Sequence, residues 1–285
     1  MIHVDESDRV EFTDFLVRDD PYCQQTYNRS NSRPVVFKNE DIVLLHSGRA
    51  GSTFAIRWYL DQNDLTSEHG WTHDHRVKEI YPSSWHVERC EAVASGVPFK
   101  MARFCRNPYS RAVSSYLHSL LHEWIHRRIV EWVGRDSGYS FLEFLNFIAD
   151  AGVQCVDSHF ATQVAHLEFM YRLDAFHRIE DGIDGLHAFE AELGVSPTSL
   201  DRYRWMVRSG HHLPYDVADD AAADRVFAIG PRAPIYPSPD AFYDERTVEL
   251  VKRLYAADFE SYGYSTDLPD LKPKVTNGRD RWVPS

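Results

Sequence analysis

Asp41-Ile42-Val43-Leu44-Leu45 runs directly into His46-Ser47-Gly48-Arg49-Ala50-Gly51-Ser52-Thr53, and this stretch decides the fold that we expect. The first part is a short apolar run typical of a buried parallel strand. The second part is rich in small residues, and the spacing of apolar residues over 54–60 then predicts a helix. The stretch therefore indicates a strand, a loop and a helix in succession. Such a loop favours an anion, because backbone N–H groups and the helix dipole point toward it.

A second segment with the same order of elements begins about fifty residues later. Residues 98–105 form the next candidate strand, and Arg106-Asn107-Pro108 follows it. Pro108 suits the first turn of a helix, which we expect to continue to about Trp132. Ser114 lies on this helix, about two turns beyond Arg106. A guanidinium and a hydroxyl placed in this way could hold a phosphate group between them.

The remaining elements complete an α/β pattern. Residues 174–179 form a third candidate strand, and a helix is expected from Gly182 to Leu193, where Gly194 closes it. Ser140 and Glu143 form a capping box before another helix, and a last helix is expected over 244–262. The predicted fold class is α/β, as a single three-layer domain. It has a short, mostly parallel sheet and a P-loop-like phosphate-binding loop after an early strand.

The chain carries no composition shift that would divide this domain. We expect residues 1–38 to be a polar N-terminal surface segment, 39–265 to form the domain, and 266–285 to be a loosely attached C-terminal tail.

Composition and charge exclude several classes of protein. The 285 residues carry a formal net charge of −12, which argues against a broad nucleic-acid surface and against adhesion to an anionic membrane. No apolar run is long enough to span a bilayer, and no secretory signal is visible, so a cytoplasmic location is expected. The four cysteines lie far apart without a CxxC pair, which predicts reduced thiols and no zinc finger: Cys23, Cys90, Cys105 and Cys155.

The loop after the first strand lacks the lysine of a nucleoside triphosphatase. A Walker A motif requires Gly-Lys-Ser/Thr, whereas this loop has Gly51-Ser52-Thr53. A triphosphate-hydrolysing motor or an ordinary kinase is therefore disfavoured. A nucleotide kinase with a degenerate loop and a non-catalytic nucleotide-binding module stay open as alternatives.

Taken together, the two segments resemble those of the PAPS-dependent sulfotransferases, specifically the carbohydrate sulfotransferase branch. The stretches 159–163 and 176–180 also resemble middle segments of that family, and 254–264 resembles its closing helix. The resemblance implies transfer of a sulfuryl group from PAPS to a hydroxyl of a saccharide or glycolipid, with release of 3′,5′-ADP. The net charge makes a neutral or lightly charged sugar the more suitable acceptor. The same net charge leaves nucleic acid out of the expected partners.

The resemblance also implies roles for individual residues. Arg106 and Ser114 would hold the 3′-phosphate of PAPS. Arg49 stands where many members carry lysine; it stays protonated and so cannot act as an acid, but it would stabilise charge on the oxygen of the departing nucleotide. The 5′-phosphosulfate would be bound by the loop residues Arg49, Ala50, Gly51, Ser52 and Thr53.

A histidine between the two segments is the expected base. Members of the branch place a base in a stretch like Thr72-His73-Asp74-His75-Arg76, and histidine suits proton transfer near neutral pH. His75 is our first candidate and His73 its substitute, with a surface loop carrying incidental histidines as the alternative. Because the sulfuryl group carries less charge than a phosphoryl group, no metal is expected.

A zinc hydrolase is the remaining alternative. His118, His122 and His126 recur every four residues, and His122-Glu123-Trp124-Ile125-His126 matches the HExxH motif. No Gly-x-x-His follows that motif. The same stripe of histidines could instead face the acceptor groove or lie on plain helix surface.

Several further residues could contact the nucleotide, although ordinary roles are the commoner ones. The tryptophans could stack on adenine or on sugar, but core packing is the more frequent role: Trp58, Trp85, Trp124 and Trp205. Basic residues of the late region could reach the 3′-phosphate: Arg204, Arg208, His211, His212 and Arg232. Positive charge gathers around the two phosphate segments: Arg49, Arg57, Arg103, Arg106 and Arg111.

Overall fold

A four-stranded sheet organises the computed structural model, which describes residues 32–65, 72–153, 156–164, 168, 172–207, 215–216, 221–230 and 236–271. The strands lie in the order β1 (Ser32–Val36), β2 (Ile42–His46), β3 (Lys100–Cys105) and β4 (Ala175–Arg178). β2, β3 and β4 are parallel, and β1 pairs antiparallel with β2. An α/β class with a small, mostly parallel sheet is thus confirmed.

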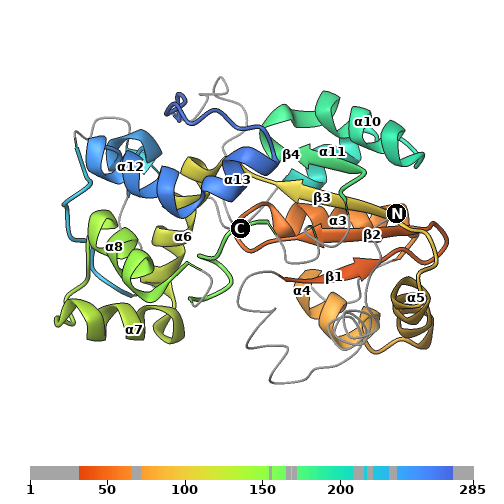
Figure 1. The fold of residues 1–285 in the computed structure, drawn as a ribbon, viewed down its shortest axis with the longest axis horizontal. Coiled ribbons are helices and arrows are strands. Elements are labelled where there is room, and N and C mark those ends of the chain that lie inside the picture. Colours follow the sequence, from red (N-terminus) through yellow and green to blue (C-terminus); the bar gives the residue numbers. More distant parts are fainter. Residues whose placement is uncertain are drawn as a thin grey trace.

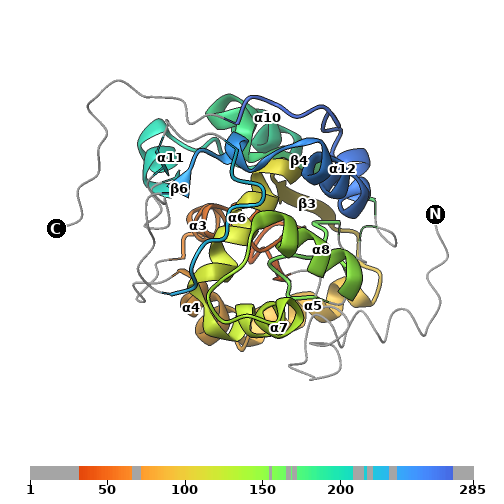
Figure 2. The same cartoon turned by 90° about the vertical axis from the view of Figure 1, so that its left-hand side faces the viewer.

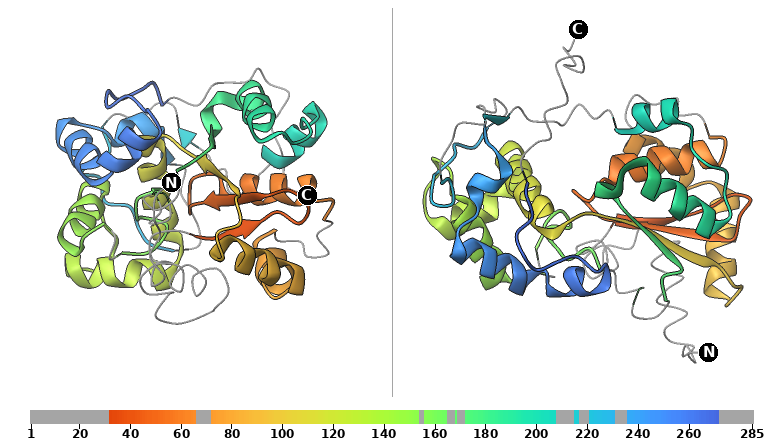
Figure 3. Two further views of the ribbon diagram at one scale, coloured as in Figure 1. Left: turned by 45° about the vertical axis from the view of Figure 1, so that its right-hand side comes forward. Right: turned by 90° about the horizontal axis from the view of Figure 1, so that it is seen from above.

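Both faces of the sheet are buried, because alternate residues of each strand point to opposite sides. Ile42 and Leu44 pack against helices α3 (Ser52–Gln62), α10 (Gly182–Leu193) and α11 (Leu200–Val207). Val43 and Leu45 pack on the other side against α5 (Ser84–Ala94). In the left view of Figure 3 the sheet lies between α10 above it and α5 below it.

A group of helices stands beside the sheet and has a core of its own. It consists of α6 (Pro108–Leu121), α7 (Glu123–Val133), α8 (Phe141–Ala151), α12 (Glu245–Leu254) and α13 (Ala256–Ser261). Figure 1 shows this group to the left of the sheet, and Figure 2 views the molecule from that side. Aromatic rings dominate its core: Tyr116 lies within 6.4 Å, centroid to centroid, of five of them.

Short elements complete the described chain. They are α4 (Thr72–His75), the π-helical turn η1 (Arg76–Ile80), the 3-10 turns η2 (Ile179–Asp181) and η3 (Pro239–Phe242), and the paired strands β5 (Tyr215–Asp216) and β6 (Tyr236–Pro237). None of the described helices combines the length and the apolar character needed to span a bilayer.

Several local predictions are confirmed. The strand predicted over 98–105 is β3, and Pro108 occupies the first turn of α6. Ser140 and Glu143 form the capping box at the start of α8. Gly194 closes α10 in a left-handed conformation, with φ of 80°.

The helix predicted from Pro108 to about Trp132 is wrong in one respect, because it is two helices. His122 adopts an extended conformation between α6 and α7. No proline or glycine stands at the break. The change of direction lets Ile129 of α7 pack into the same core as Leu120 of α6. The single last helix predicted over 244–262 is likewise divided, at Tyr255, into α12 and α13.

The strand β1 lies within residues 1–38, which the sequence analysis assigned to the surface. Val35, Val36 and Phe37 are fully buried. The backbone N–H of Val36 donates to Nε2 of His86 at 3.3 Å, and its carbonyl accepts from the Tyr59 hydroxyl at 3.0 Å. Side chains thus satisfy the outward backbone groups of this edge residue. Within the tail predicted from residue 266, the carbonyl of Thr266 accepts a hydrogen bond from the hydroxyl of Tyr109.

A buried histidine makes the fold sensitive to acid. His177 of β4 is 2% exposed and packs against Phe54, Phe104 and Phe189. Burial lowers its pKa from 6.5 to about 4, because the charged imidazolium would lose its hydration. A group whose pKa is lower in the folded chain takes up a proton more readily when unfolded. Its contribution to stability is therefore complete above pH 6.5 and is lost as the pH falls toward 4.

Replacing His177 by leucine should make the free energy of unfolding less dependent on pH. The shift corresponds to about 3 kcal/mol of unfolding free energy between neutral pH and pH 4, and His177→Leu should remove that part of the loss. Urea unfolding of both proteins at several pH values between 7 and 4 measures it. Phe176→Leu changes the exposed side of the same strand. Its free energy of unfolding should fall with decreasing pH as steeply as that of wild type. An equally steep loss in His177→Leu would contradict the assignment.

Candidate active site

The parallel strands end at one edge of the sheet, and the two segments predicted to bind phosphate follow them there. The loop 47–51 leaves β2, Arg106 and Asn107 leave β3, and Ile179 and Glu180 leave β4. The carboxyl edge of such a sheet is the usual place for a ligand in α/β proteins. Topology thus brings together residues that are more than fifty positions apart in the chain.

The loop after β2 has a conformation that requires glycine at position 51. Gly51 has φ of 76°, and a Cβ there would lie 2.9 Å from Cγ2 of Ile179. The first turn of α3 that follows carries no acidic residue, and its N-cap residue, Gly51, has no side chain that could cap it. The backbone N–H groups at this helix start therefore remain suited to an anion.

Arg49 joins this loop to helix α6. Its Nε and Nη2 donate to Oγ of Ser114 at 3.0 and 2.8 Å. Arg49 also has φ of 62°, a left-handed conformation that costs a non-glycine residue about 1 kcal/mol. Strain of this kind is often retained where a side chain must be held in place. The structure thus brings together Arg49 and Ser114, two residues that the sequence analysis placed in one site.

Arg106 lies against the same loop. Its Nη1 donates to the carbonyl oxygen of Arg49 at 3.2 Å, and its Nε has no hydrogen-bond partner among the described residues. The Gln163 side chain fixes its backbone, since Oε1 accepts from the N–H of Arg106 and Nε2 donates to its carbonyl, both at 2.8 Å. The guanidinium is therefore anchored at the loop and keeps donor capacity.

The buried Arg111 fastens the loops around the site. Its Nε donates to the carbonyl of Gly48 at 3.0 Å, and its Nη1 donates to the carbonyl of Ala161 at 2.5 Å. Nη2 lies 3.5 Å from the carbonyl of His159. Burial lowers the pKa of Arg111, although the carboxylate of Asp258 opposes the shift. One guanidinium from α6 thus holds two separate loops.

Asp258 of α13 extends this support. It is fully buried, and its Oδ1 accepts from the backbone N–H groups of Gln163 and Val164 at 2.7 and 3.0 Å. Burial raises the pKa of this carboxyl group. Since Gln163 in turn fixes Arg106, the C-terminal helix contributes to the site without reaching it.

The two histidines predicted as the base have different surroundings. Nε2 of His73 lies 3.3 Å from the Thr53 hydroxyl, at the start of α3. His75 is 3% exposed, and its Nδ1 lies 3.1 Å from a carboxylate oxygen of Glu79. The structure therefore brings His73, rather than His75, to the loop. The catalytic role of either one stays a prediction.

Three other histidines gather beside Arg49. The ring of His118 lies 4.3 Å from that of His122 and 4.7 Å from that of His159, centroid to centroid. Nδ1 of His118 is 3.5 Å from Nη1 of Arg49. Burial lowers the pKa of His122, and the positive charges of nearby residues act in the same direction. The spacing in the sequence singled out His118 and His122 but gave no signal that His159 would join them.

The break between α6 and α7 removes the helix that an HExxH motif needs. Zinc proteases place the two histidines on successive turns of one helix, whereas His122 here is the extended residue before α7. Within the described ranges, no group of three or more histidine, cysteine or acidic side chains is arranged to hold a metal ion.

Most of the arginines predicted to gather around the phosphates have structural partners instead. Arg103 is fully buried and forms an ion pair with Glu168 at 2.6 Å. Arg57 lies over the ring of Trp205 and donates to the Met206 carbonyl at 3.1 Å. Arg111 also contacts the loop, but it is buried and donates to backbone carbonyls, so Arg49 and Arg106 are the two of this group that we assign to ligand binding.

The other candidates carry less information about the site. Trp58 is buried in the core, where its Nε1 donates to Glu190 at 2.9 Å. Arg204 is exposed on α11, 3.7 Å from Asp201. Trp85 is partly buried against the core. Four candidates, and the side chain of a fifth, lie outside the described residues: Arg208, His211, His212, Arg232 and the side chain of Trp124.

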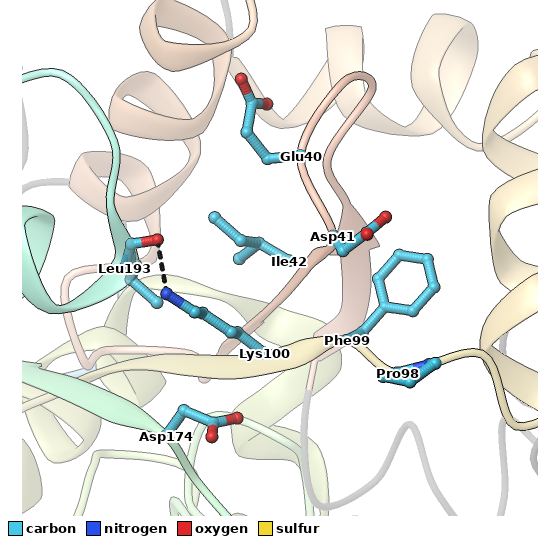
Figure 4. Close-up of a pocket in the computed structure, with 8 residues that line it drawn as sticks. All are labelled: Glu40, Asp41, Ile42, Pro98, Phe99, Lys100, Asp174 and Leu193. Carbon is cyan, nitrogen blue, oxygen red and sulfur yellow. Dashed lines mark hydrogen bonds between the residues drawn. The ribbon is translucent and has the colours of Figure 1, made fainter.

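A hollow of about 430 Å³ lies at the opposite edge of the sheet (Figure 4). It is lined in part by Lys100 and Asp174, at the amino end of β3 and just before β4. The chain itself satisfies both groups, since Lys100 donates to the carbonyl of Leu193 and Asp174 accepts from the N–H of Met101. This hollow is therefore separate from the candidate site.

Comparisons with known proteins gave no relative: no family model matched the chain, and neither did any curated protein or solved structure at a significant level.

Removing the Arg111 guanidinium should strongly destabilise the protein. Arg111→Met removes the donor to the carbonyl groups of Gly48 and Ala161, at a cost of about 3 kcal/mol, whereas the carbonyl of His159 keeps the Ser115 hydroxyl. Urea unfolding measures the loss. The control Arg127→Met changes an exposed side chain of α7, which should cost less than about 0.5 kcal/mol. Similar stabilities of the two variants would show that Arg111 does not hold the loops.

Proposed function

We propose that this chain transfers a sulfuryl group from PAPS to a hydroxyl of a saccharide or glycolipid and releases 3′,5′-ADP. The observation that carries the proposal is the contact between the two phosphate segments. Arg49 of the first segment donates twice to Ser114 of the second, and Arg106 donates to the backbone of Arg49. Two segments that would each bind a phosphate are thereby adjacent, which supports a nucleotide with phosphates on both sides of its ribose.

Each segment would take one phosphate of the nucleotide. The N–H groups and hydroxyls of Ser52 and Thr53, at the start of α3, would hold the 5′-phosphosulfate. Arg106 and Ser114 would hold the 3′-phosphate through a charge-assisted hydrogen bond and a hydroxyl. A P-loop-like sulfotransferase fold is part of this proposal.

The chemistry needs positioning and charge stabilisation more than bond-making by the protein. The acceptor oxygen attacks sulfur in line with the bridging oxygen that departs on the 5′-phosphate, much as in phosphoryl transfer. Arg49 lies at the loop with a permanent charge, and it would stabilise the negative charge developing on that oxygen. Of the two histidines that the sequence predicts as the base, His73 lies beside Thr53, and His75 is buried next to Glu79.

The charge distribution favours a neutral or lightly charged acceptor. The chain as a whole has a net charge of −12, and Arg103 and Arg111 are fully buried. A nucleotide would therefore engage the positive charge that stands at the loop. A highly sulfated polymer would meet a predominantly acidic chain and be repelled.

Binding of 3′,5′-ADP tests the proposal without knowledge of the acceptor. At a concentration about a hundredfold above Kd, it should stabilise the folded chain by about 2.7 kcal/mol, which raises Tm by about 5 °C in a chain of this size. ADP, which lacks the 3′-phosphate, should stabilise it much less. Arg106→Ala should remove most of the difference, because a charge-assisted hydrogen bond contributes about 1.5–3 kcal/mol. Differential scanning fluorimetry measures these shifts.

Arg127→Ala is the control for loss of a positive charge, since this side chain is exposed on α7 and distant from the loop in sequence. It should keep the wild-type shifts. Equal stabilisation by ADP and 3′,5′-ADP would favour the kinase or nucleotide-module alternatives. An unchanged 3′,5′-ADP shift in Arg106→Ala would remove the assignment of the 3′-phosphate.

Substituting Arg49 by glycine should separate ligand binding from stability. Glycine adopts the left-handed conformation of this residue without strain, and that gain should offset the lost hydrogen bonds to Ser114. The unfolding free energy should change by less than about 1 kcal/mol, whereas the shift with 3′,5′-ADP should be largely lost. Asp64→Gly, at the other described non-glycine residue with positive φ, is the control and should keep the shift. Retention of the shift in Arg49→Gly would exclude a role for this side chain in binding.

A further inference from the structure

An Asp–His pair stands next to the candidate site, in the segment between α8 and β4. Oδ1 of Asp157 lies 2.5 Å from Nδ1 of His159 and accepts the backbone N–H of His159 at 2.9 Å. A carboxylate beside Nδ1 fixes the proton on that nitrogen, so the basic lone pair of the neutral ring is on Nε2. Aspartate thus orients the ring and would stabilise it once Nε2 takes up a proton.

The fold holds this ring against the loop that we propose binds the phosphosulfate. A Cβ on Gly48 would lie 3.0 Å from Cδ2 of His159, the ring carbon bonded to Nε2. The backbone carbonyl of His159 accepts from the Ser115 hydroxyl at 2.6 Å. The backbone of His159 is therefore fixed from α6, and its ring lies beside the loop with the Cγ–Cδ2 edge toward Gly48.

Access distinguishes this pair from His75, which also has a carboxylate partner. His75 pairs with Glu79 but is 3% exposed, which closes its ring to a saccharide. The side chain of His159 is 28% exposed, and that of Asp157 is 26% exposed. A base needs both an orienting partner and contact with the hydroxyl from which it takes a proton. His159 meets both requirements.

The charged and titratable groups around His159 come from three elements. Asp157 faces it from the same segment, His118 and Arg111 face it from α6, and His122 from the residue before α7. Arg111 adds positive charge, and the Asp157 carboxylate offsets it. Hydrogen bonds from His159 keep the pKa of Asp157 below its usual value, although burial alone would raise it. The carboxylate is thus present as the anion when the ring must accept a proton.

We propose that His159, oriented by Asp157, is the base that takes the proton from the acceptor hydroxyl, an inference that rests on the proposed sulfuryl transfer. In this step the acceptor oxygen forms a bond to the sulfur of PAPS. The bond between sulfur and the bridging oxygen breaks, and the electron pair leaves on the 5′-phosphate of 3′,5′-ADP. The hydroxyl proton moves to Nε2 of His159 and is later released to water.

The test compares two acceptors that differ in their need for a base. Release of 3′,5′-ADP from PAPS is measured with a panel of neutral saccharides and with p-nitrophenol, whose hydroxyl is substantially ionised near neutral pH. His159→Gln should lower the rate with the reactive saccharide about 10²- to 10⁴-fold and leave the rate with p-nitrophenol within a few-fold of wild type. It should also keep the thermal shift with 3′,5′-ADP, because the ring does not hold the nucleotide.

Asp157→Asn supplies an independent variant that keeps the imidazole. Loss of the carboxylate weakens the proton affinity of the ring, so the acid limb of kcat/KM against pH should move to lower pH, while the rate with saccharides falls at least about tenfold. His187→Gln, on α10 and hydrogen-bonded to the Thr198 carbonyl, is the control and should match wild type with both acceptors.

The outcomes separate this inference from the proposed function. Saccharide transfer at the wild-type rate in His159→Gln, with an unchanged pH profile, would overturn the base and leave sulfuryl transfer intact. An equal loss with both acceptors would also overturn it, since it indicates a structural role. Absence of a 3′,5′-ADP shift in wild type, or of PAPS turnover with every saccharide, would count against the proposed function and the base together.

Discussion

The arrangement of the candidate site depends on one buried positive charge, the guanidinium of Arg111. Taking such a group out of water costs several kcal/mol unless its donors are satisfied. Here two donors reach the carbonyls of Gly48 and Ala161, and a third faces that of His159. The backbone carbonyls satisfy the guanidinium only when both loops keep this arrangement. Any other loop conformation would leave the buried charge without acceptors, so burial of Arg111 constrains the conformation of the two loops. Asp258 tightens the same region from the C-terminal helix by holding the N–H groups of Gln163 and Val164.

Much of the sheet and its immediate connections could be predicted because the signals are local. The apolar run before His46, the proline at the start of α6 and the glycine that ends α10 each act within a few residues. A parallel sheet then places the segments after its strands at one edge. Adjacency of Arg49 and Ser114 follows from that rule rather than from any property of the residues themselves.

What could not be predicted depends on contacts between distant segments. The break at His122 has no proline or glycine to mark it, and it is explained by the packing of Ile129 in a core that periodicity alone does not define. His73 and His75 are indistinguishable in the sequence, yet one reaches Thr53 and the other turns toward Glu79. His159 meets His118 only through the fold, since more than forty residues separate them. The roles of the arginines near the loop could not be predicted either, because the sequence does not show that Arg103 and Arg111 are buried and bind structural partners.

The edge strand β1 has a consequence for how copies of the chain behave toward one another. An open strand edge offers unpaired N–H and C=O groups that can recruit another chain and begin aggregation. On β1 the outward N–H and C=O of Val36 are occupied by His86 and Tyr59, and Arg89 donates to the carbonyl of Phe37. Pro34 removes a further donor, and the pairing with β2 is irregular between Ser32 and Val35. Intermolecular extension of the sheet along β1 is therefore blocked, which protects the folded chain from self-association by strand addition at that edge.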